Sequence, residues 1–399
     1  MKRYLITGGA GFIGSNFVKY LLAKYDSEIE LLILDALTYA GHAGTIAEEV
    51  ARDNVSFVRG NICDAELVER LILDFDPDYV VNFAAESHVD RSITEPRLFM
   101  ETNILGTQTL LEACRRAWQE GKDESGRPVY RDGKKFLQIS TDEVYGSLTR
   151  DYSEPQPLEL DERVKRVTEG RPQPTAFGKG LFTESTPLAP RSPYSAAKTS
   201  ADLITMAYSE TFGLPVNITR CSNNYGPYHF PEKLIPLVIN NILEGKKLPV
   251  YGRGENVRDW LYVDDHAKAI DTVLRRGKTG EIYNIGGFNE EQNISIVKAI
   301  IDIIRRIMEE EPEYRHLLHQ PVEDINYDLI SYVTDRPGHD MRYAIDPTRI
   351  ATELGWYPET TFTEGIEKTV RWNLDNHEWL RSVTSGDYLR YYDEMYGNR

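Results

Sequence analysis

The sequence predicts an α/β fold, a doubly wound parallel sheet followed by a smaller, mixed C-terminal part. Over the first third of the 399-residue chain, short apolar runs alternate with segments of helical spacing. This alternation implies a parallel sheet with helices on both faces. From about residue 223 the pattern is less regular, with many Pro and Gly. We therefore expect one domain at 1–222 and a second part mainly at 223–399, with some of its segments returning to the first domain.

Each predicted element follows from its local pattern. The predicted strands are apolar runs, namely Arg3–Thr7, Glu30–Asp35, Asp78–Ala85, Lys135–Ser140 and Pro215–Arg220. The predicted helices have helical spacing of apolar residues, and they are Gly14–Tyr25, Asp64–Phe75, Phe99–Trp118, Pro193–Phe212, Asp264–Arg276, Ser295–Glu309 and Thr363–Asn373. Polar segments near 120–133 and 148–180 are expected to be surface insertions. Ligands of such sheets bind at the carboxyl ends of the strands, so residues there are the candidates for a site.

Composition narrows the class of protein. The formal net charge of −17 disfavours a nucleic-acid surface. The longest apolar runs fall far short of the roughly 20 residues that a membrane helix needs. Cys63, Cys114 and Cys221 are widely spaced and form no disulfide or metal-binding pattern. The N-terminus begins a strand rather than a signal peptide, so we expect a cytoplasmic protein without a metal site.

A glycine-rich turn follows the first strand. "TGGAGFIGS" places Gly8, Gly11 and Gly14 between a strand and a helix, where glycines let the backbone approach a pyrophosphate and the helix N-terminus supplies N–H donors. Asp35 ends the next strand, and an acid there accepts hydrogen bonds from an adenosine ribose and favours NAD over NADP. The alternatives are a tight turn without a ligand and, for Asp35, an ordinary cap. Asp64 either reaches the adenine or only caps a helix.

Tyr194 and Lys198 form a YxxxK pair in "SPYSAAKTSAD". Ser192 is the expected N-cap and Pro193 the first helical residue, and the i, i+4 spacing puts both side chains on one helix face. A phenol has a reference pKa of about 10, which must fall before it acts as a base near neutral pH. A nearby ammonium and a positive nicotinamide both lower it. YxxxK alone is common by chance, but together with the glycine turn and the acid it predicts a redox base.

The stretch "ISTDEVYG" ends the fourth predicted strand with Thr141, Asp142 and Glu143. A loop gains nothing structural from two adjacent carboxylates, because they repel each other. Adjacent acids near a low-dielectric cofactor push their pKa values apart, so that one holds a proton while the other stays ionised. The alternative is that both acids cap a turn. Tyr145 is expected only to pack.

These motifs resemble the extended short-chain dehydrogenase/reductase family over nearly the whole chain. The resemblance rests on "GGAGFIGS", "STDEVYG", "YSAAK", "RDWLYVDDHAKA" and "DRPGHDMRYAID". "AAESHVDRSI" and "SNNYGPYHFPEKLIP" are most similar to its nucleotide-sugar dehydratases. The resemblance implies a Rossmann domain, bound NAD, dTDP-glucose as substrate and a homodimer formed by the helices Phe99–Trp118 and Pro193–Phe212.

The resemblance also implies two sets of binding residues. The residues expected to bind NAD are Gly8, Gly11, Phe12, Ile13, Gly14, Asp35, Leu37, Thr38, Asp64, Ala84, Ala85, Thr102, Tyr194, Lys198 and Asn224. The residues expected to bind substrate are Ser87, Thr141, Asn223, Lys233, Leu234, Pro249, Tyr251, Arg258, Asn293, Arg336 and His339. Arg258 and Arg336 suit bidentate contact with a diphosphate, and Tyr251 offers a ring face to a pyrimidine.

The catalytic roles are likewise implied by the resemblance. Tyr194, beside Lys198, takes the C4 hydroxyl proton while hydride passes to NAD, and Thr141 hydrogen-bonds the C4 oxygen. The C4 ketone acidifies C5–H, which Glu143 removes, and Asp142 protonates the departing O6. Hydride then returns to C6, so NAD is recycled. The order of the two acids rests on the resemblance alone.

Three alternatives stay open. A UDP-sugar 4-epimerase needs the Tyr–Lys pair but not the acid pair, UDP- or CDP-glucose can replace dTDP-glucose, and a non-enzymatic NAD-binding regulator usually lacks the Tyr–Lys pair. The chain departs from the family pattern in length, because 148–180 is longer than the usual loop and "DYLRYYDEMYGNR" extends the C-terminus. Neither segment carries a named motif, so they leave kinetics and assembly open rather than the reaction.

Overall fold

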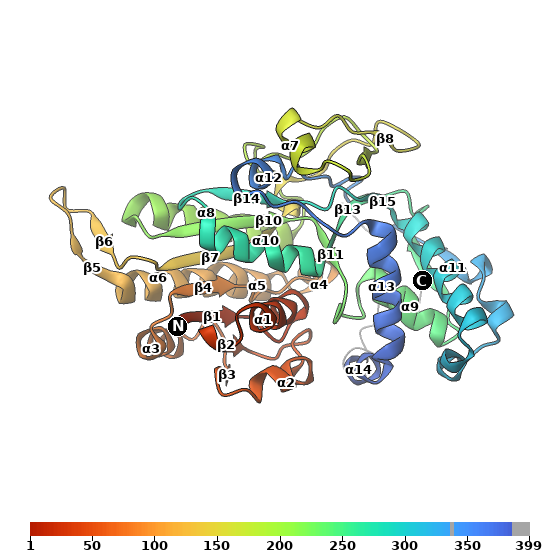
Figure 1. The fold of residues 1–399 in the computed structure, drawn as a ribbon, viewed down its shortest axis with the longest axis horizontal. Helices are drawn as coiled ribbons and strands as arrows, with labels where there is room; N and C mark the ends of the chain where they lie inside the picture. Colours follow the sequence, from red (N-terminus) through yellow and green to blue (C-terminus); the bar gives the residue numbers. More distant parts are fainter. Residues whose placement is uncertain (336–338, 385–399) are drawn as a thin grey trace.

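A seven-stranded parallel sheet forms the centre of the larger domain (Figure 1). The computed structural model describes residues 1–335 and 339–384. The strand order is β14-β10-β7-β4-β1-β2-β3, and all neighbouring strands are parallel. The strands are β1 (Lys2–Thr7), β2 (Ile29–Asp35), β3 (Val55–Arg59), β4 (Tyr79–Asn82), β7 (Lys135–Thr141), β10 (Val216–Cys221) and β14 (Ile282–Ile285). The predicted doubly wound sheet is confirmed, with β3 and β14 as strands that the sequence analysis did not identify.

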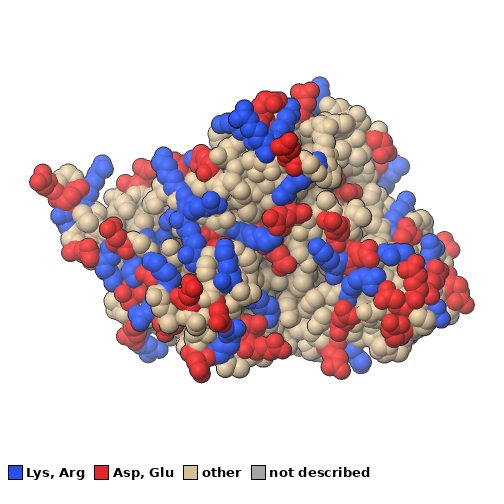
Figure 2. All heavy atoms as spheres, viewed as in Figure 1, with Lys and Arg blue, Asp and Glu red and all other residues tan. Residues whose placement is uncertain are grey.

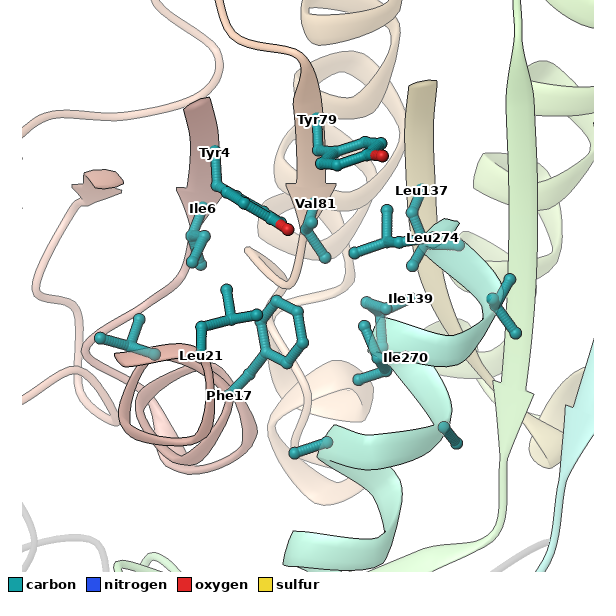
Figure 3. Close-up of a cluster of buried hydrophobic side chains, with 14 of the residues drawn as sticks. Tyr4, Ile6, Phe17, Leu21, Tyr79, Val81, Leu137, Ile139, Ile270 and Leu274 are labelled. Carbon is teal, nitrogen blue, oxygen red and sulfur yellow. The ribbon is translucent and has the colours of Figure 1, made fainter. Parts of the chain in front are cut away.

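Helices cover both faces of the sheet. One face carries α1 (Phe12–Tyr25) and α10 (Val263–Arg276), and the other carries α3 (Ala65–Phe75), α6 (Thr107–Trp118) and α8 (Pro193–Phe212). Figure 3 shows Phe17 of α1 and Ile270 of α10 pointing toward the strands. Ile6 belongs to this core, whereas its neighbour Leu5 belongs to the core on the opposite face. This alternation follows from the two-residue period of a strand.

Capping residues begin two of these helices where the sequence predicts. Ser192 and Ser195 form a capping box at α8, in which each side-chain oxygen accepts from the other's backbone N–H at 3.0 Å. Pro193 is the first residue of α8, where its missing N–H leaves no hydrogen bond unmade. Asp64 caps α3 by accepting from the Leu67 N–H at 3.1 Å.

The predicted helix Phe99–Trp118 contains a π-helical stretch. The chain passes through α4 (Val89–Thr94), α5 (Pro96–Phe99) and the π-helix η3 (Met100–Gly106) into α6. The wider turn places Asn103 opposite the backbone of Glu86, and the two residues exchange hydrogen bonds of 2.9 and 3.0 Å. Glu86 lines the cavity described below, which agrees with the tendency of π-turns to occur at functional sites.

The smaller part has its own apolar core, next to the sheet domain (Figure 1). Its helices are α9 (Leu234–Leu243), α11 (Asn293–Glu310), α13 (Phe362–Asp375) and α14 (His377–Val383). Its strands are β11 (Asn223–Tyr225), β13 (Val257–Tyr262) and β15 (Glu290–Gln292) in one sheet, and β12 (Leu248–Tyr251) and β16 (Ile330–Val333) in another. Two elements that follow β11 in the chain, α10 and β14, return to the large sheet.

The two polar insertions have structure of their own. One forms a hairpin of β5 (Gln119–Lys122) and β6 (Pro128–Tyr130) that projects from the sheet domain (Figure 1). The other contains β8 (Gln156–Pro157), α7 (Glu162–Val167) and β9 (Thr175–Ala176), and it packs on α12 (Thr348–Leu354). Its ends are held by Arg342, which is fully buried, pairs with Glu290 at 2.7 Å and donates to the Gly180 carbonyl at 2.9 Å.

Charges of both signs are mixed over the surface. Figure 2 shows Lys and Arg interspersed with Asp and Glu on the visible face, so on that face the net charge of −17 is not gathered in one acidic patch. Among the described residues, no helix combines the length and apolarity that crossing a bilayer requires.

Arg342→Leu is expected to lower the free energy of unfolding by about 3–5 kcal/mol, because it leaves Glu290 buried without its partner. Urea unfolding followed by circular dichroism measures this loss. The matched control is Arg97→Leu. Arg97 pairs with Glu101 but its side chain is 90% exposed, so its removal should change stability little. Similar losses in the two variants would contradict a structural role for the Arg342 pair.

Candidate active site

A cavity of about 330 Å³ opens at the carboxyl ends of β1, β2, β4, β7 and β10. Its lining contains most of the residues predicted to bind the cofactor, namely Gly8, Gly11, Phe12, Ile13, Gly14, Asp35, Thr38, Ala84, Ala85, Thr102, Tyr194, Lys198 and Asn224. It also contains the acid pair and part of the predicted substrate set, namely Ser87, Thr141, Asp142, Glu143, Asn223 and Lys233. The parallel sheet therefore brings the three main motifs to one cavity.

The glycine turn is shaped by two close backbone approaches. Gly8 has φ +69°, and a Cβ on it would lie 2.6 Å from the Ala84 nitrogen. A Cβ on Gly14 would lie 2.3 Å from the Gly8 oxygen, too close for any side chain. Gly11 differs, because a Cβ there would meet only the Gly8 oxygen, at 3.4 Å. Gly8 and Gly14 thus allow the turn to form, while Gly11 keeps open the cavity side at the N-terminus of α1.

Asp35 is held beside this turn by two backbone donors. Its Oδ2 accepts from the Ala10 N–H at 2.9 Å and its Oδ1 from the Leu37 N–H at 2.8 Å. Burial raises the pKa of Asp35, and these two hydrogen bonds oppose the rise. The carboxylate therefore has a defined orientation at the cavity wall, with lone pairs left to accept from a ribose hydroxyl.

The Tyr–Lys pair is buried on α8. Lys198 Nζ donates to the Ile139 carbonyl of β7 at 2.6 Å. Burial raises the pKa of Tyr194 well above its ordinary value, and the nearby Glu143 charge raises it further. Burial also lowers the pKa of Lys198. The expected lowering of the Tyr194 pKa is thus not a property of the protein alone and depends on positive charge brought close to the ring.

The two acids lie in different environments. Thr141 accepts from the Glu143 N–H at 3.2 Å, which begins the turn after β7, and its hydroxyl donates to Asp142 at 3.3 Å. Asp142 is 1% exposed. Burial raises its pKa well above the ordinary value, and the charges of Glu143 and Asp259 add to this rise. Glu143 is only half-buried. Of the two acids, Asp142 therefore has the environment that favours the protonated form.

The remaining predicted residues lie outside the lining of this cavity. Leu37 donates its backbone N–H to Asp35, and Asp64 caps α3. Arg258 is buried and donates to the carbonyls of Val257 and Asp340 at 2.7 and 3.0 Å. The others belong to the smaller part: Leu234 begins α9, Pro249 and Tyr251 are in β12, Asn293 begins α11, and His339 accompanies Tyr251 in an edge-on ring contact. Arg336 lies outside the described residues.

The lining also contains residues that were not predicted, among them His229, Glu86 and Glu232. His229 stacks on Phe12 with ring centroids 4.5 Å apart, and burial lowers its pKa to about 3. Glu86 and Glu232 are also buried, and Glu232 accepts from Arg91 at 3.3 Å. All three lie within "AAESHVDRSI" or "SNNYGPYHFPEKLIP", so the motifs contained the signal but spacing alone gave them no role.

Comparisons with known proteins cover the whole chain. The model of the NAD dependent epimerase/dehydratase family matches residues 4–286. The dTDP-glucose 4,6-dehydratase of Shigella flexneri is 47% identical over 397 residues, which are 100% of this chain and 99% of the relative.

Solved structures of two enzymes are similar to this chain over most of its length. The dTDP-glucose 4,6-dehydratase of Bacillus anthracis in complex with NAD is 42% identical, with a TM-score of 0.76 over 96% of this chain and 100% of that chain. The UDP-glucose 4-epimerase of Thermus thermophilus in complex with NAD is 27% identical, with a TM-score of 0.71 over 94% of this chain and 99% of that chain.

Gly14→Ala is expected to destabilise the protein by about 2 kcal/mol, because its Cβ has no space beside the Gly8 oxygen. Gly11→Ala is the matched control and should leave stability nearly unchanged. Urea unfolding of both variants measures the difference. A Gly14→Ala protein as stable as Gly11→Ala would show that the turn relaxes freely.

Proposed function

Because the chain belongs to the NAD dependent epimerase/dehydratase family, we propose that it is a dTDP-glucose 4,6-dehydratase, a hydro-lyase that forms dTDP-4-keto-6-deoxyglucose and water. One observation carries the choice of reaction. Asp142 and Glu143 line the same cavity as Tyr194 and Lys198, and burial raises the pKa of Asp142 well above its ordinary value. The family comparisons support the nucleotide sugar, since full-length relatives at 47% identity bear this name.

The cavity fits NAD. The open N-terminus of α1 at Gly11 suits a pyrophosphate, because its N–H groups and helix dipole favour negative charge. Asp35 is oriented to accept from the adenosine ribose, which favours NAD over NADP. Bound NAD would accept the C4 hydride and return it to C6.

Tyr194 is the proposed base for the C4 hydroxyl. Its buried ring needs an adjacent positive charge to ionise, and Lys198, one helical turn away, supplies an ammonium. Thr141 begins the turn that carries the acids and is proposed to donate to the C4 oxygen. The lining residues nearest this step, Thr141, Tyr194 and Lys198, are buried, which limits the access of water to them.

Elimination is assigned to the acid pair. Glu143, the more exposed acid, is proposed to remove the C5 proton once C4 is a ketone. Asp142 is proposed to give its proton to the departing O6, since hydroxide is a poor leaving group. A UDP-sugar 4-epimerase needs neither step, so the acid pair favours the dehydratase.

The substrate's nucleotide is proposed to lie toward the smaller part. Lys233 lines the cavity and donates to the Ser87 carbonyl at 3.2 Å, which supports a place for it near the sugar diphosphate. Arg258 remains the proposed diphosphate contact, and Tyr251 the proposed contact of the base. In this view 1–222 holds mainly NAD and 223–399 mainly the nucleotide sugar.

The proposal is tested by incubating the purified protein with dTDP-glucose and following the alkaline absorbance of the 4-keto-6-deoxy product. UDP-glucose and CDP-glucose compete in the same assay and decide the base preference. C4 inversion without loss of water would contradict the proposal. We also propose a cytoplasmic role in deoxysugar synthesis of the rhamnose type, which the free state of Cys63, Cys114 and Cys221 supports.

Tyr194→Phe and Glu143→Gln should stop the reaction at different points. With the phenol removed, no reduced nicotinamide should appear in a single turnover, because the C4 proton has no acceptor. With the carboxylate removed, reduced nicotinamide should appear, but product formation should fall about a hundredfold or more. Stopped-flow absorbance measures both. Normal product formation by Glu143→Gln would refute the role assigned to Glu143.

A homodimer is proposed through the face that contains α4, α5, η3 and α8. Leu105 and Leu203 on this face are each 57% exposed, and these elements contact one another. The double change Leu105→Glu and Leu203→Glu should therefore convert a dimer to a monomer. Sedimentation velocity measures the state. Leu73→Glu on α3, where Leu73 is equally exposed, is the control and should not change it; a monomeric parent protein would reject the proposal.

A further inference from the structure

Behind the Tyr–Lys pair lies a buried ion pair. Asp202 lies on α8 one turn beyond Lys198, and its side chain is 1% exposed. Arg220 of β10 donates from Nε to Asp202 Oδ2 at 2.8 Å, and the Arg220 side chain is 4% exposed. Tyr194, Lys198 and Asp202 thus follow one another at i, i+4 and i+8 along one buried helix face.

The ion pair continues into the stretch that carries the acids. Arg220 donates from Nη1 to the Tyr145 hydroxyl at 3.0 Å, and that hydroxyl donates to Asn284 Oδ1 at 2.8 Å. Phe182 stacks on the Tyr145 ring at 5.1 Å. Tyr145, which was expected only to pack, is therefore a hydrogen-bonded member of a buried network that joins α8, β10 and the turn after β7.

We propose that Asp202 is a positioning residue for Lys198: its carboxylate, one helical turn away and held by Arg220 and through it by Tyr145, stabilises the buried Lys198 ammonium. The proposal rests on the proposed function only in that Lys198 acts there beside Tyr194.

The electrostatics of the described neighbours agree with this geometry. Burial lowers the pKa of Lys198, and the Asp202 charge is the largest opposing cause, followed by Cys221 of β10. Burial raises the pKa of Asp202, and Arg220 opposes this rise, aided by Ser140 of β7 and by Lys198. The Ile139 carbonyl accepts from Lys198 but carries no net charge. Asp202 is therefore the principal group that offsets the cost of burying the ammonium.

The network also holds the Asp202 carboxylate in place and favours its ionised form. An unclamped buried carboxylate would take up a proton or rotate away from Lys198. The hydrogen bond from Arg220 fixes one carboxylate oxygen, and the Tyr145 hydroxyl in turn fixes the guanidinium. Burial raises the pKa of Tyr145 to about 12 against the opposing effect of Arg220, and Glu184 adds to the rise, so the phenol serves as a neutral hydrogen-bond partner.

The test measures the charge state of Lys198 directly. The protein without added substrate is labelled with trace acetic anhydride across a pH series, and mass spectrometry of the peptide with residue 198 gives the labelling midpoint. Asp202→Asn removes the charge, Asp202→Glu retains it, and Glu210→Gln removes an exposed carboxylate from the same helix. If Asp202→Asn does not fold, the charge-balanced double change Asp202→Asn with Arg220→Met replaces it.

The midpoint should move to lower pH in Asp202→Asn or in its double variant, stay at the parent value in Glu210→Gln, and return toward it in Asp202→Glu. The alkaline limb of kcat/KM against pH should move in the same direction, with about a tenfold loss at the parent's alkaline half-maximum. An unchanged labelling midpoint in a folded Asp202 variant overturns the inference. Labelling needs no turnover, so a parent protein inactive on dTDP-glucose would reject the proposed function and not this one.

Discussion

The hydrogen bond from Lys198 Nζ to the Ile139 carbonyl joins α8, which carries the proposed redox base Tyr194, to β7, the strand that directly precedes the acid pair. Ile139 lies two residues before Thr141, so this bond sets the distance between α8 and the turn that begins at the end of β7. In the proposed reaction, the groups assigned to oxidation and to elimination act on neighbouring carbons of one sugar. Because α8 and β7 are rigid and are joined by this buried hydrogen bond, the two sets of groups keep a fixed position relative to each other.

The degree of burial differs among the ionisable groups of the site and changes their pKa values. Asp142 is buried beside another acid, which raises its pKa, whereas Glu143 is more exposed. Burial also raises the pKa of Tyr194, so its proposed function as a base depends on positive charge brought close to the ring. The buried Asp202–Arg220 pair is a further effect of burial. Because Arg220 compensates the charge of Asp202, Asp202 can in turn compensate the buried ammonium of Lys198, as proposed above.

Much of the site was predictable because it depends on short motifs. The glycine turn, Asp35, the acid pair and the Tyr–Lys helix each carry a local signature, and a parallel sheet brings all strand ends to one edge. Sequence spacing assigned no role to three cavity residues, Glu86, His229 and Glu232. They lie in loops, and the conformation of these loops cannot be predicted from local sequence patterns. The π-helical stretch Met100–Gly106 was missed for a similar reason. It supports a hydrogen bond between Asn103 and Glu86, which lie 17 residues apart in the chain.

The sequence by itself determined five of the seven strands of the large sheet, the caps of α3 and α8, and the residue types at the ends of those strands, because these depend on interactions within a few residues. Only the tertiary structure decided that Tyr145 bonds to Arg220, that Arg220 clamps Asp202, and that Asp142 is the more deeply buried acid. These are contacts between elements far apart in the chain. Their energies depend on burial and distance, which no local spacing encodes.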